Sequence, residues 1–384
     1  MSRLRVAVLH HWFVTHGGGE RVAECLAALL PEAEIFTLVH TPQGLPQSLR
    51  DRSLHASFLQ RIPGANRRHR ELMPLYPEAA RSLDLRGFDL VISSDSGPIK
   101  GARIPEGTPH LCYCHSPMRY LYDGFKDYRD SMAGVQRLLF SWLAPRVRRS
   151  DYAAAQKVTR FVANSHYVQR RIQQNYGRES VVIYPPIDLH RARFNTPGIA
   201  YLAAGRMVGY KKTEIIVEAC TRLHRALRVV GTGPEEAALR AIAGPTVEFL
   251  GHLSQEQLWD EYSRCRALLF AADEDLGMVP LEAQSCGRPV IAYGVGGALE
   301  TVRGEPQPDP TGIFFAQQTA DSLIEAMLRY ESHENTFTRE AARKNAEAFA
   351  APVFLAAMRA AILEMMPQAA DSLANVEQAL QTIG

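Results

Sequence analysis

Long apolar runs are missing from this chain of 384 residues, and none approaches the ~20 residues that a membrane-spanning helix requires. The opening residues also lack the basic and apolar segments of a signal peptide. Only six cysteines are present, and none forms a C-x-x-C pair, so we expect reduced thiols in the core rather than disulfides or a metal site. These absences predict a protein that stays in the cytoplasm.

An excess of one charge is also missing, because 43 Lys and Arg nearly balance 41 Asp and Glu. The balance hides an asymmetry. Residues 1–186 contain 25 basic and 16 acidic side chains, a net charge of +9, and the remainder carries −7. A basic half favours an anionic partner such as phosphate, nucleic acid or a membrane surface, and the open alternative is that two oppositely charged domains attract each other.

Two basic clusters lie in that first half. One consists of Arg61, Arg67, Arg68 and Arg70, and the other ends the apolar stretch Val135–Arg149 with Arg146, Arg148 and Arg149. The second stretch could touch an anionic membrane surface, although an internal amphipathic helix is the favoured interpretation.

The chain does contain short apolar runs that alternate with helical patterns through both halves, which is typical of doubly wound parallel sheets. Its length predicts two domains. The prolines of Tyr184-Pro185-Pro186 end strand and helix alike, so we place the domain boundary there. A last helix is expected at about 352–365, and residues 367–384 carry no signal.

Residues 268–300 carry the most informative pattern. Leu268–Ala271 is long enough for one buried strand, and an acidic loop with Gly277 leads into a helix whose first turn suits Pro280. Glu274 in the loop and Glu282 in the helix are eight residues apart and could face one cavity at the carboxyl edge of the sheet. Two solvated carboxylates are the alternative.

Two further turns are suited to anions. Gly17-Gly18-Gly19 lies between a strand at Leu4–Leu9 and a helix, which is a phosphate-binding arrangement or a flexible turn. Its spacing does not fit a dinucleotide fingerprint. In the second half, Arg206 and Lys211 precede a helix at about 213–223, so both charges can face one anion together with the positive end of that helix.

These stretches resemble glycosyltransferase family 4, retaining enzymes of the GT-B fold that use nucleotide-diphosphate sugars. The likeness covers about residues 1–365 and is greatest to bacterial transferases of polysaccharide and O-antigen synthesis, including mannosyltransferases. It implies two Rossmann-like domains facing a cleft: an acceptor-side domain at 1–186, a nucleotide-sugar-binding domain at 187–351, and a segment at 352–384 whose helix packs back on the first domain.

The resemblance also implies roles for individual residues. Glu282 would bind the ribose, and Glu274 and His115 would lie beside the donor sugar as the catalytic pair. Arg206 and Lys211 would bind the diphosphate. The remaining donor-side residues would be Gly18, Gly19, Leu276, Gly277 and Met278, and the acceptor side would include His11, Trp12 and Arg119. Related chains often have His-Asp-Trp where this one has His10-His11-Trp12, which leaves two alternatives open: a different acceptor, or replacement of that Asp by His11.

The resemblance therefore predicts transfer of a sugar, with mannose from GDP-mannose favoured, to a saccharide or a lipid-linked saccharide. No metal is expected, because Arg206 and Lys211 supply positive charge to the leaving diphosphate. A nucleotide-sugar epimerase of the same fold and a non-catalytic sugar-nucleotide-binding subunit remain open. We expect a cytoplasmic protein, with attachment to the inner face of the membrane left open, and no nucleic-acid partner.

Overall fold

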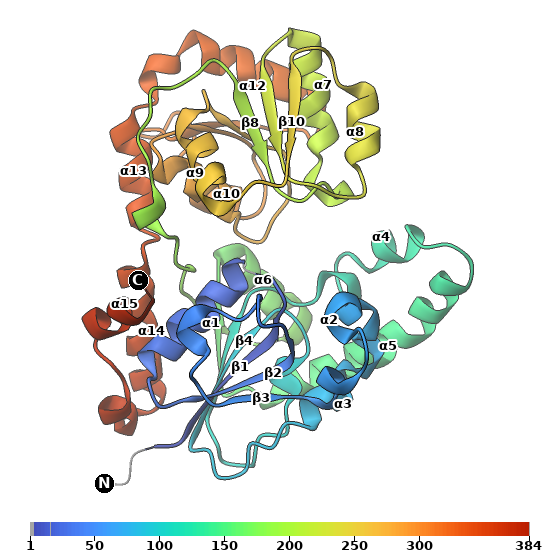
Figure 1. The fold of residues 1–384 in the computed structure, drawn as a ribbon, viewed down its shortest axis with the longest axis vertical. Helices are drawn as coiled ribbons and strands as arrows, with labels where there is room; N and C mark the ends of the chain where they lie inside the picture. The colour runs from blue at the N-terminus through green and yellow to red at the C-terminus, as the bar shows by residue number, and fades with distance from the viewer. Residues whose placement is uncertain (1–3, 16, 384) are drawn as a thin grey trace. The chain divides into compact units, whose positions relative to one another are not determined.

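The computed structural model describes residues 4–15 and 17–383, which form two compact units (Figure 1). Unit 1 contains residues up to Pro186 together with Ala351 onward, and unit 2 contains Ile187–Ala350. Each unit is built on its own parallel sheet. No helix among the described residues has both the length and the apolarity to cross a bilayer.

Unit 1 contains a sheet of seven parallel strands in the order β3-β2-β1-β4-β5-β6-β7. The strands are β1 (Val6–Phe13), β2 (Glu34–His40), β3 (Leu54–Ala56), β4 (Leu90–Asp95), β5 (His110–Cys114), β6 (Arg160–Ala163) and β7 (Ser180–Val182). The helices are α1 (Gly18–Leu29), α2 (Ala65–Arg68), α3 (Tyr76–Arg81), α4 (Phe125–Asp130), α5 (Gly134–Lys157), α6 (His166–Tyr176), α14 (Ala351–Met365) and α15 (Val376–Ile383).

Both faces of this sheet are covered. Val6 and Val8 of β1 face a core made with α1, α14 and α15, while Ala7 and Leu9 face the other side, where α3 packs. Helix α14 packs within unit 1, where the ring centroids of Phe354 and Tyr113 are 5.7 Å apart. The tail without a sequence signal is helical, and its apolar side chains belong to the same core.

Unit 2 contains six parallel strands in the order β10-β9-β8-β11-β12-β13. The strands are β8 (Tyr201–Ala204), β9 (Leu227–Val230), β10 (Val247–Gly251), β11 (Leu268–Phe270), β12 (Val290–Tyr293) and β13 (Gly312–Phe315). The helices are α7 (Thr213–Leu223), α8 (Glu236–Ile242), α9 (Gln255–Arg264), α10 (Met278–Ser285), α11 (Ala298–Thr301), α12 (Ala320–Ser332) and α13 (Arg339–Glu347).

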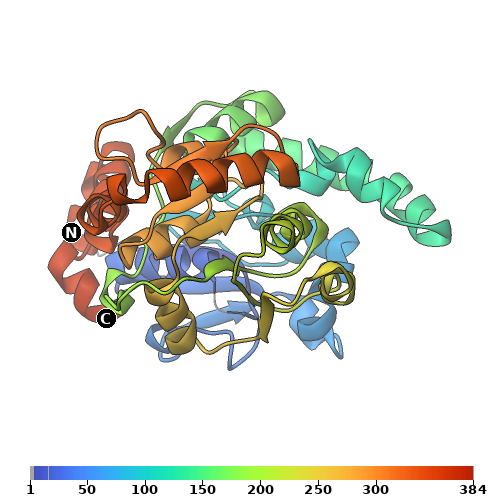
Figure 2. The same cartoon turned by 90° about the horizontal axis from the view of Figure 1, so that it is seen from above.

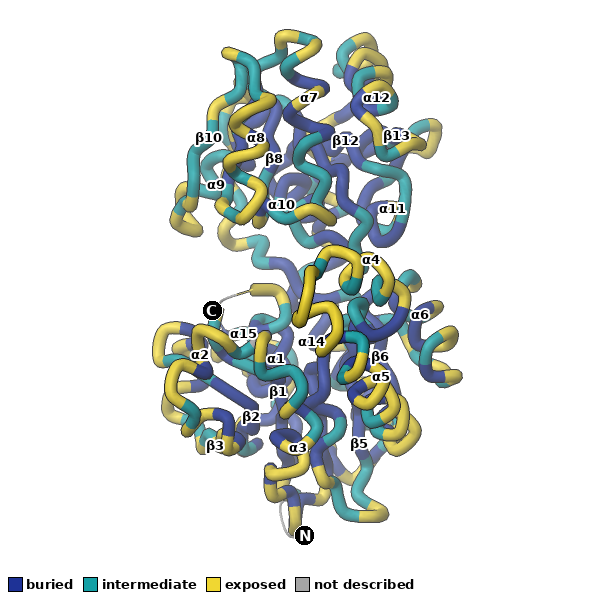
Figure 3. The backbone as a smooth tube through the Cα atoms, turned by 90° about the vertical axis from the view of Figure 1, so that its right-hand side faces the viewer, coloured by how far each residue is buried: buried dark blue, intermediate teal, exposed yellow. Residues whose placement is uncertain are grey.

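Local sequence signals explain many element ends. Ser165 accepts a hydrogen bond from the Val168 N–H at the start of α6, and Gly177 ends that helix in the left-handed conformation. Ser254 and Gln257 form a capping box at the start of α9. The six cysteines are buried free thiols, as expected. In the tube of Figure 3 the central strands, such as β1 and β12, are mostly buried, whereas the edge strands β3 and β10 are not.

The two sheets share one topology. Numbered within its own unit, each has the strand order 3-2-1-4-5-6, which unit 1 extends by a seventh strand, and chain order reverses between the first strand and the fourth. The fold class predicted from the sequence, two Rossmann-like doubly wound domains, is confirmed. In open α/β sheets ligands bind beyond the carboxyl ends of the strands at this reversal. Ligand-binding residues are therefore expected after β8 and β11 in unit 2 and at the ends of β1 and β4 in unit 1.

Candidate active site

A small cavity, about 20 Å³ in volume, opens at the reversal point of unit 2. The ends of β8 and β11 line it, together with Gly205, Arg206 and Lys211. The chain makes very close backbone contacts here. A Cβ on Gly231, after β9, would lie 2.0 Å from the Gly205 carbonyl oxygen, so only glycine fits at that position.

Two predicted diphosphate ligands lie at this cavity, but they are not equivalent. Arg206 is exposed on the loop after β8. Lys211 ends the turn before α7, and its Nζ forms an ion pair with the carboxylate of Glu274, with both side chains less than one-fifth exposed. The resemblance implies separate ligands for Lys211 and Glu274, the diphosphate and the sugar, whereas in the structure the two side chains pair with each other. Without a ligand, therefore, one of the two cations is neutralised by the residue assigned to the sugar.

The loop that holds Glu274 packs against the backbone of Gly297. The Gly297 N–H donates to the Glu274 carbonyl oxygen at 2.8 Å. A Cβ on Gly297 would lie 2.1 Å from Cα of Leu276, so the two chain segments could not approach this closely with any other residue. Sequence reasoning included Gly297 in the informative stretch without giving it this supporting role.

The start of α10 contains the other predicted donor-side residues. Gly277, with φ of +86°, precedes the helix, and Met278 is its first residue. Leu276 is buried, so its side chain belongs to the core and only its backbone is suited to a ligand contact. Met278 is half-buried.

Glu282 lies in α10, one turn after Met278. Its Oε2 accepts a hydrogen bond from the hydroxyl of Tyr262 in α9 at 2.7 Å. Burial raises the pKa of Glu282 above its ordinary range, while the Tyr262 hydrogen bond and the charge of Lys211 oppose that shift. Sequence reasoning missed Tyr262, because a single tyrosine twenty positions away carries no local signal.

In unit 1, β1 is longer than expected. The sequence predicted a strand at Leu4–Leu9, but the strand continues to Phe13. That predicted end is wrong because β2 pairs with β1 over this stretch, and Ser94 at the end of β4 is paired with His10. The polar rings of His10 and His11 therefore lie in the sheet.

The predicted acceptor-side residues are placed differently from one another. His11 is buried, its Nε2 lies 3.1 Å from Oγ of Ser96, and burial lowers its pKa to about 3, so the ring is neutral. Trp12 is half-buried and packs against the rings of His69 and Tyr76. Arg119 is half-buried on the loop after β5.

His115 belongs to a chain of hydrogen bonds. Its Nε2 lies 2.8 Å from Oγ of Ser94, and that hydroxyl lies 3.1 Å from Nδ1 of His10. Nδ1 of His10 also lies 3.2 Å from the Ser94 carbonyl oxygen, and since a carbonyl only accepts, the proton of His10 is on Nδ1. Burial lowers the pKa of His10 well below its ordinary range, so this ring is neutral.

The Ser94 hydroxyl thus contacts both rings. It accepts from Nδ1 of His10 and lies within hydrogen-bond distance of Nε2 of His115, as acceptor or donor according to the tautomer of His115. Sequence reasoning missed Ser94, which is 21 residues away from His115 along the chain.

The glycine turn lies beside these rings. Helix α1 begins at Gly18, and a Cβ on Gly19 would lie 3.4 Å from Cε1 of His10 and 3.7 Å from Nε2 of His115. Gly19 thus leaves the space of one methyl group open next to both rings. Glu20 follows in the same helix, and burial raises its pKa to about 7. It is a third residue, after Tyr262 and Ser94, that sequence reasoning did not select.

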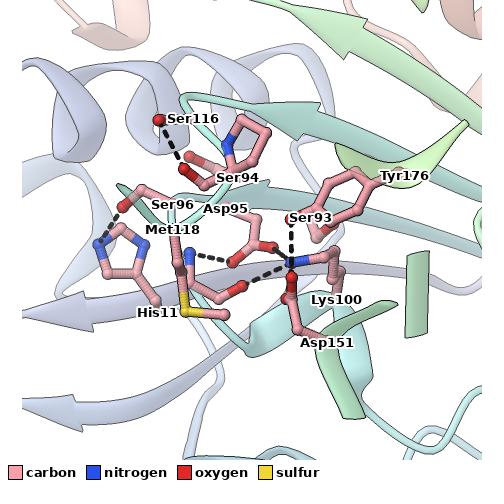
Figure 4. Close-up of polar contacts among 12 residues, drawn as sticks. His11, Ser93, Ser94, Asp95, Ser96, Lys100, Ser116, Met118, Asp151 and Tyr176 are labelled. Atoms are coloured by element: carbon pink, nitrogen blue, oxygen red, sulfur yellow. Dashed lines mark hydrogen bonds and ion pairs between the residues drawn. The ribbon is translucent and has the colours of Figure 1, made fainter. Parts of the chain in front are cut away.

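A buried ion network holds the end of β4, which contains Ser94, and the loop after it, which contains Ser96 (Figure 4). Nζ of Lys100 donates to Oδ2 of Asp95 at 3.0 Å and to the Gly97 carbonyl oxygen at 2.8 Å, and it forms an ion pair with Asp151 of α5. Both carboxylates are about 1% exposed. Because Asp95 lies between the two serines, this network positions the hydroxyls that bind His11 and His115.

Within residues 4–15 and 17–383, no group of three or more His, Cys, Asp or Glu side chains could hold a metal ion.

The two units match two family models. Residues 16–191 match the model described as Glycosyltransferase Family 4, and residues 189–349 match Glycosyl transferases group 1. The chain belongs to glycosyltransferase family 4.

Curated relatives of this family 4 glycosyltransferase are distant. A GDP-mannose-dependent monoacylated alpha-(1-6)-phosphatidylinositol monomannoside mannosyltransferase of Corynebacterium glutamicum is 28% identical over 43% of this chain and 50% of its own length. The O-antigen chain mannosyltransferase C of Escherichia coli is 25% identical over 47% and 51%. The chain thus spans about half the length of these relatives.

Solved structures support the fold over nearly the full length of this family 4 glycosyltransferase. Anabaena HepE in complex with UDP and glucose is 16% identical, with a TM-score of 0.68 over 94% of this chain and 99% of that one. Sucrose-phosphate synthase from Thermosynechococcus elongatus is 19% identical, with the same TM-score over 95% and 100%. At these identities the likeness establishes the GT-B fold alone.

Proposed function

We propose that this family 4 glycosyltransferase moves a sugar from a nucleotide-diphosphate donor to a saccharide acceptor, with retention at the anomeric carbon. The observation that carries the proposal is the group at the reversal point of unit 2. There Arg206 and Lys211 lie beside one cavity, and Glu274 is paired with Lys211. Such a group suits a diphosphate that is attached to a polar, uncharged sugar.

Each charged group has a proposed task in the transfer. Arg206, Lys211 and the start of α7 stabilise the negative charge that develops on the leaving diphosphate. Glu282, held by Tyr262, accepts hydrogen bonds from the ribose hydroxyls. When the diphosphate takes Lys211, the carboxylate of Glu274 is released and can accept from hydroxyls of the sugar.

The residues of unit 1 have proposed tasks in positioning. His115, held by Ser94, positions the donor sugar. His11, Trp12 and Arg119 belong to the acceptor side. A donor phosphate oxygen takes the proton of the acceptor on the same face of the sugar, which is the usual proposal for this family because it lacks a settled carboxylate nucleophile.

The favoured donor is GDP-mannose, and the favoured acceptor is a saccharide or a lipid-linked saccharide in polysaccharide synthesis. Two relatives support this choice, because their names specify mannosyl transfer, one of them from GDP-mannose. We propose a metal-independent reaction in the cytoplasm, with the acceptor presented at the inner face of the membrane.

A panel of nucleotide sugars in a thermal-shift assay tests the proposal, since a ligand that binds only the native state raises its apparent stability. GDP-mannose should raise the melting temperature more than UDP-sugars, and added acceptor should then yield a glycosylated product. Release of an epimerised sugar nucleotide without transfer would favour the epimerase alternative. Binding without turnover of any kind would favour a non-catalytic subunit.

A further inference from the structure

Helix α5 has two apolar faces on opposite sides. Its inner face packs into unit 1 through Phe140, Ala144, Val147 and Ala155. Its outer face, which we call the α5 stripe, consists of Val135, Leu138, Leu139 and Trp142, and these side chains are 52–72% exposed. The spacing of three, four and seven residues puts the stripe on one side of the helix, about half a turn from the inner face.

The structure thus corrects the sequence interpretation of this segment. An internal amphipathic helix was favoured, and Phe140 does pack inside, but the neighbouring Leu138 and Leu139 do not. Periodicity alone could not reveal this, because both faces of the helix are apolar. Four large apolar side chains that stay exposed on consecutive turns are more than the scattered surface residues of an ordinary soluble domain.

The α5 stripe lies on the projecting part of unit 1. Figures 1 and 2 show α4 and the first half of α5 extending away from the rest of the unit, and Figure 3 shows this hairpin as mostly exposed backbone. The second half of the helix is held in the unit by Asp151, the partner of Lys100. The helix therefore presents the stripe on a rigid element that is tied to the site loop of unit 1.

Basic side chains follow the α5 stripe along the same side of the helix. Arg146 and Arg149 are both exposed, one and two turns beyond Trp142, and the Arg146 guanidinium lies 3.8 Å from the centre of the Trp142 ring. Residues 131–150 contain no Asp or Glu. At the turn of the α4–α5 hairpin, Asp130 is paired with Arg129 and Arg137. The surface is thus apolar in its centre and cationic at its end.

From this arrangement we infer that the α4–α5 hairpin docks on an anionic membrane surface. The α5 stripe enters the boundary between headgroups and acyl chains, and Arg146 and Arg149 bind lipid phosphates. Charge complementarity favours this occupant over a stripe-to-stripe contact with a second copy of the chain, because the stripe of that copy contains no acidic side chain to neutralise these arginines.

The first test is sedimentation with phosphatidylcholine vesicles, with and without phosphatidylglycerol. The full chain should bind the anionic vesicles at low salt and lose affinity at high salt, where charges are screened. The variant Arg146→Glu/Arg149→Glu should bind at least about thirtyfold more weakly. Arg148 is left unchanged, because its guanidinium packs 4.9 Å from the centre of the Tyr122 ring.

The matched control reverses two exposed arginines of the other basic cluster. Arg61→Glu/Arg67→Glu makes the same charge change in unit 1 at exposed residues that lie outside α5. It should bind within about threefold of wild type, since the charges that contact the lipid remain. Equal losses in the two variants would overturn the proposed location, because net charge alone would then explain binding.

The apolar contribution needs its own pair of variants. Leu138→Ser/Leu139→Ser should weaken binding at least about tenfold. Leu299→Ser/Leu328→Ser, which changes two comparably exposed leucines of unit 2, should not. Emission of Trp142 should shift to the blue on anionic vesicles, with Trp142→Phe as the baseline.

Three results would overturn the inference. They are no binding of wild type to anionic vesicles at low salt, no blue shift of Trp142, and a stripe-dependent doubling of mass in light scattering without vesicle binding. The last result would assign the surface to a second copy. Because these assays use no sugar nucleotide, they can fail independently of the proposed transferase activity.

Discussion

The ion pair between Lys211 and Glu274 predicts that loss of a site carboxylate will increase the affinity for a ligand. Replacing Glu274 by glutamine keeps the shape of the side chain but frees the charge of Lys211 for a ligand. Glu274→Gln should therefore bind inorganic diphosphate more tightly than wild type. Turnover should nevertheless fall, because the proposed ligand of the sugar hydroxyls is weakened.

The magnitude follows from the geometry of the pair. Two unit charges at about 4 Å attract each other by ~4 kcal/mol at the effective dielectric of a protein surface. Both side chains are 17–18% exposed, so solvent reduces this value. We expect about 1–2 kcal/mol to appear in ligand binding, which is a gain of roughly fivefold to thirtyfold in affinity.

Isothermal titration with inorganic diphosphate measures this gain without any sugar or base. The matched control is Glu214→Gln, which frees Lys212 from an exposed pair with a separation of 3.4 Å and should change affinity less than about twofold. In the double variant Lys211→Ala/Glu274→Gln the gain should vanish. Unchanged or weaker binding by Glu274→Gln alone would refute the idea that Glu274 holds Lys211 until the diphosphate arrives.

Four further predictions concern single groups. Lys211→Ala should lower turnover at least ~100-fold, from loss of about 3 kcal/mol of charge stabilisation, and turnover within threefold of wild type would remove this residue from the site. Glu282→Gln should weaken binding of nucleoside diphosphate but not of inorganic diphosphate, so equal losses would refute a ribose contact. EDTA should leave activity nearly unchanged, and activity that is abolished by chelation and restored by Mg²⁺ or Mn²⁺ would contradict stabilisation by side chains alone. Burial raises the pKa of Glu20 from 4.5 to about 7. Between these pH values Glu20 binds more protons in the native state than in the unfolded state, so the free energy of unfolding should fall as pH rises through this window. Wild type should lose about 3 kcal/mol more than Glu20→Gln in chemical denaturation between those two pH values, and parallel profiles would show that Glu20 titrates normally.

The strands of both sheets were largely predictable, because buried parallel strands read as short apolar runs. The limits Leu227–Val230 and Val290–Tyr293 follow directly from such runs. The continuation of β1 through His10-His11-Trp12 was not predictable. Its polar rings are accommodated by Ser94 and Ser96, which are more than eighty residues away along the chain.

The charged residues of the candidate site were predictable from their place at strand ends, but their partners were not. The pair between Lys211 and Glu274 joins residues 63 positions apart, and Tyr262 reaches Glu282 from another helix. The network of Lys100 was also invisible, since Asp95 and Asp151 have no common motif in the sequence. Such contacts depend on how the sheets are wound, and no local pattern encodes them.

The central claim is retention during sugar transfer from a nucleotide donor, and slow hydrolysis of the donor tests it without knowledge of the acceptor. GDP-mannose, an α-linked donor, would be incubated with the enzyme and the released sugar followed by proton NMR before its anomers equilibrate. The account predicts that α-mannose appears first, at a rate that Lys211→Ala lowers. Initial release of β-mannose would contradict retention.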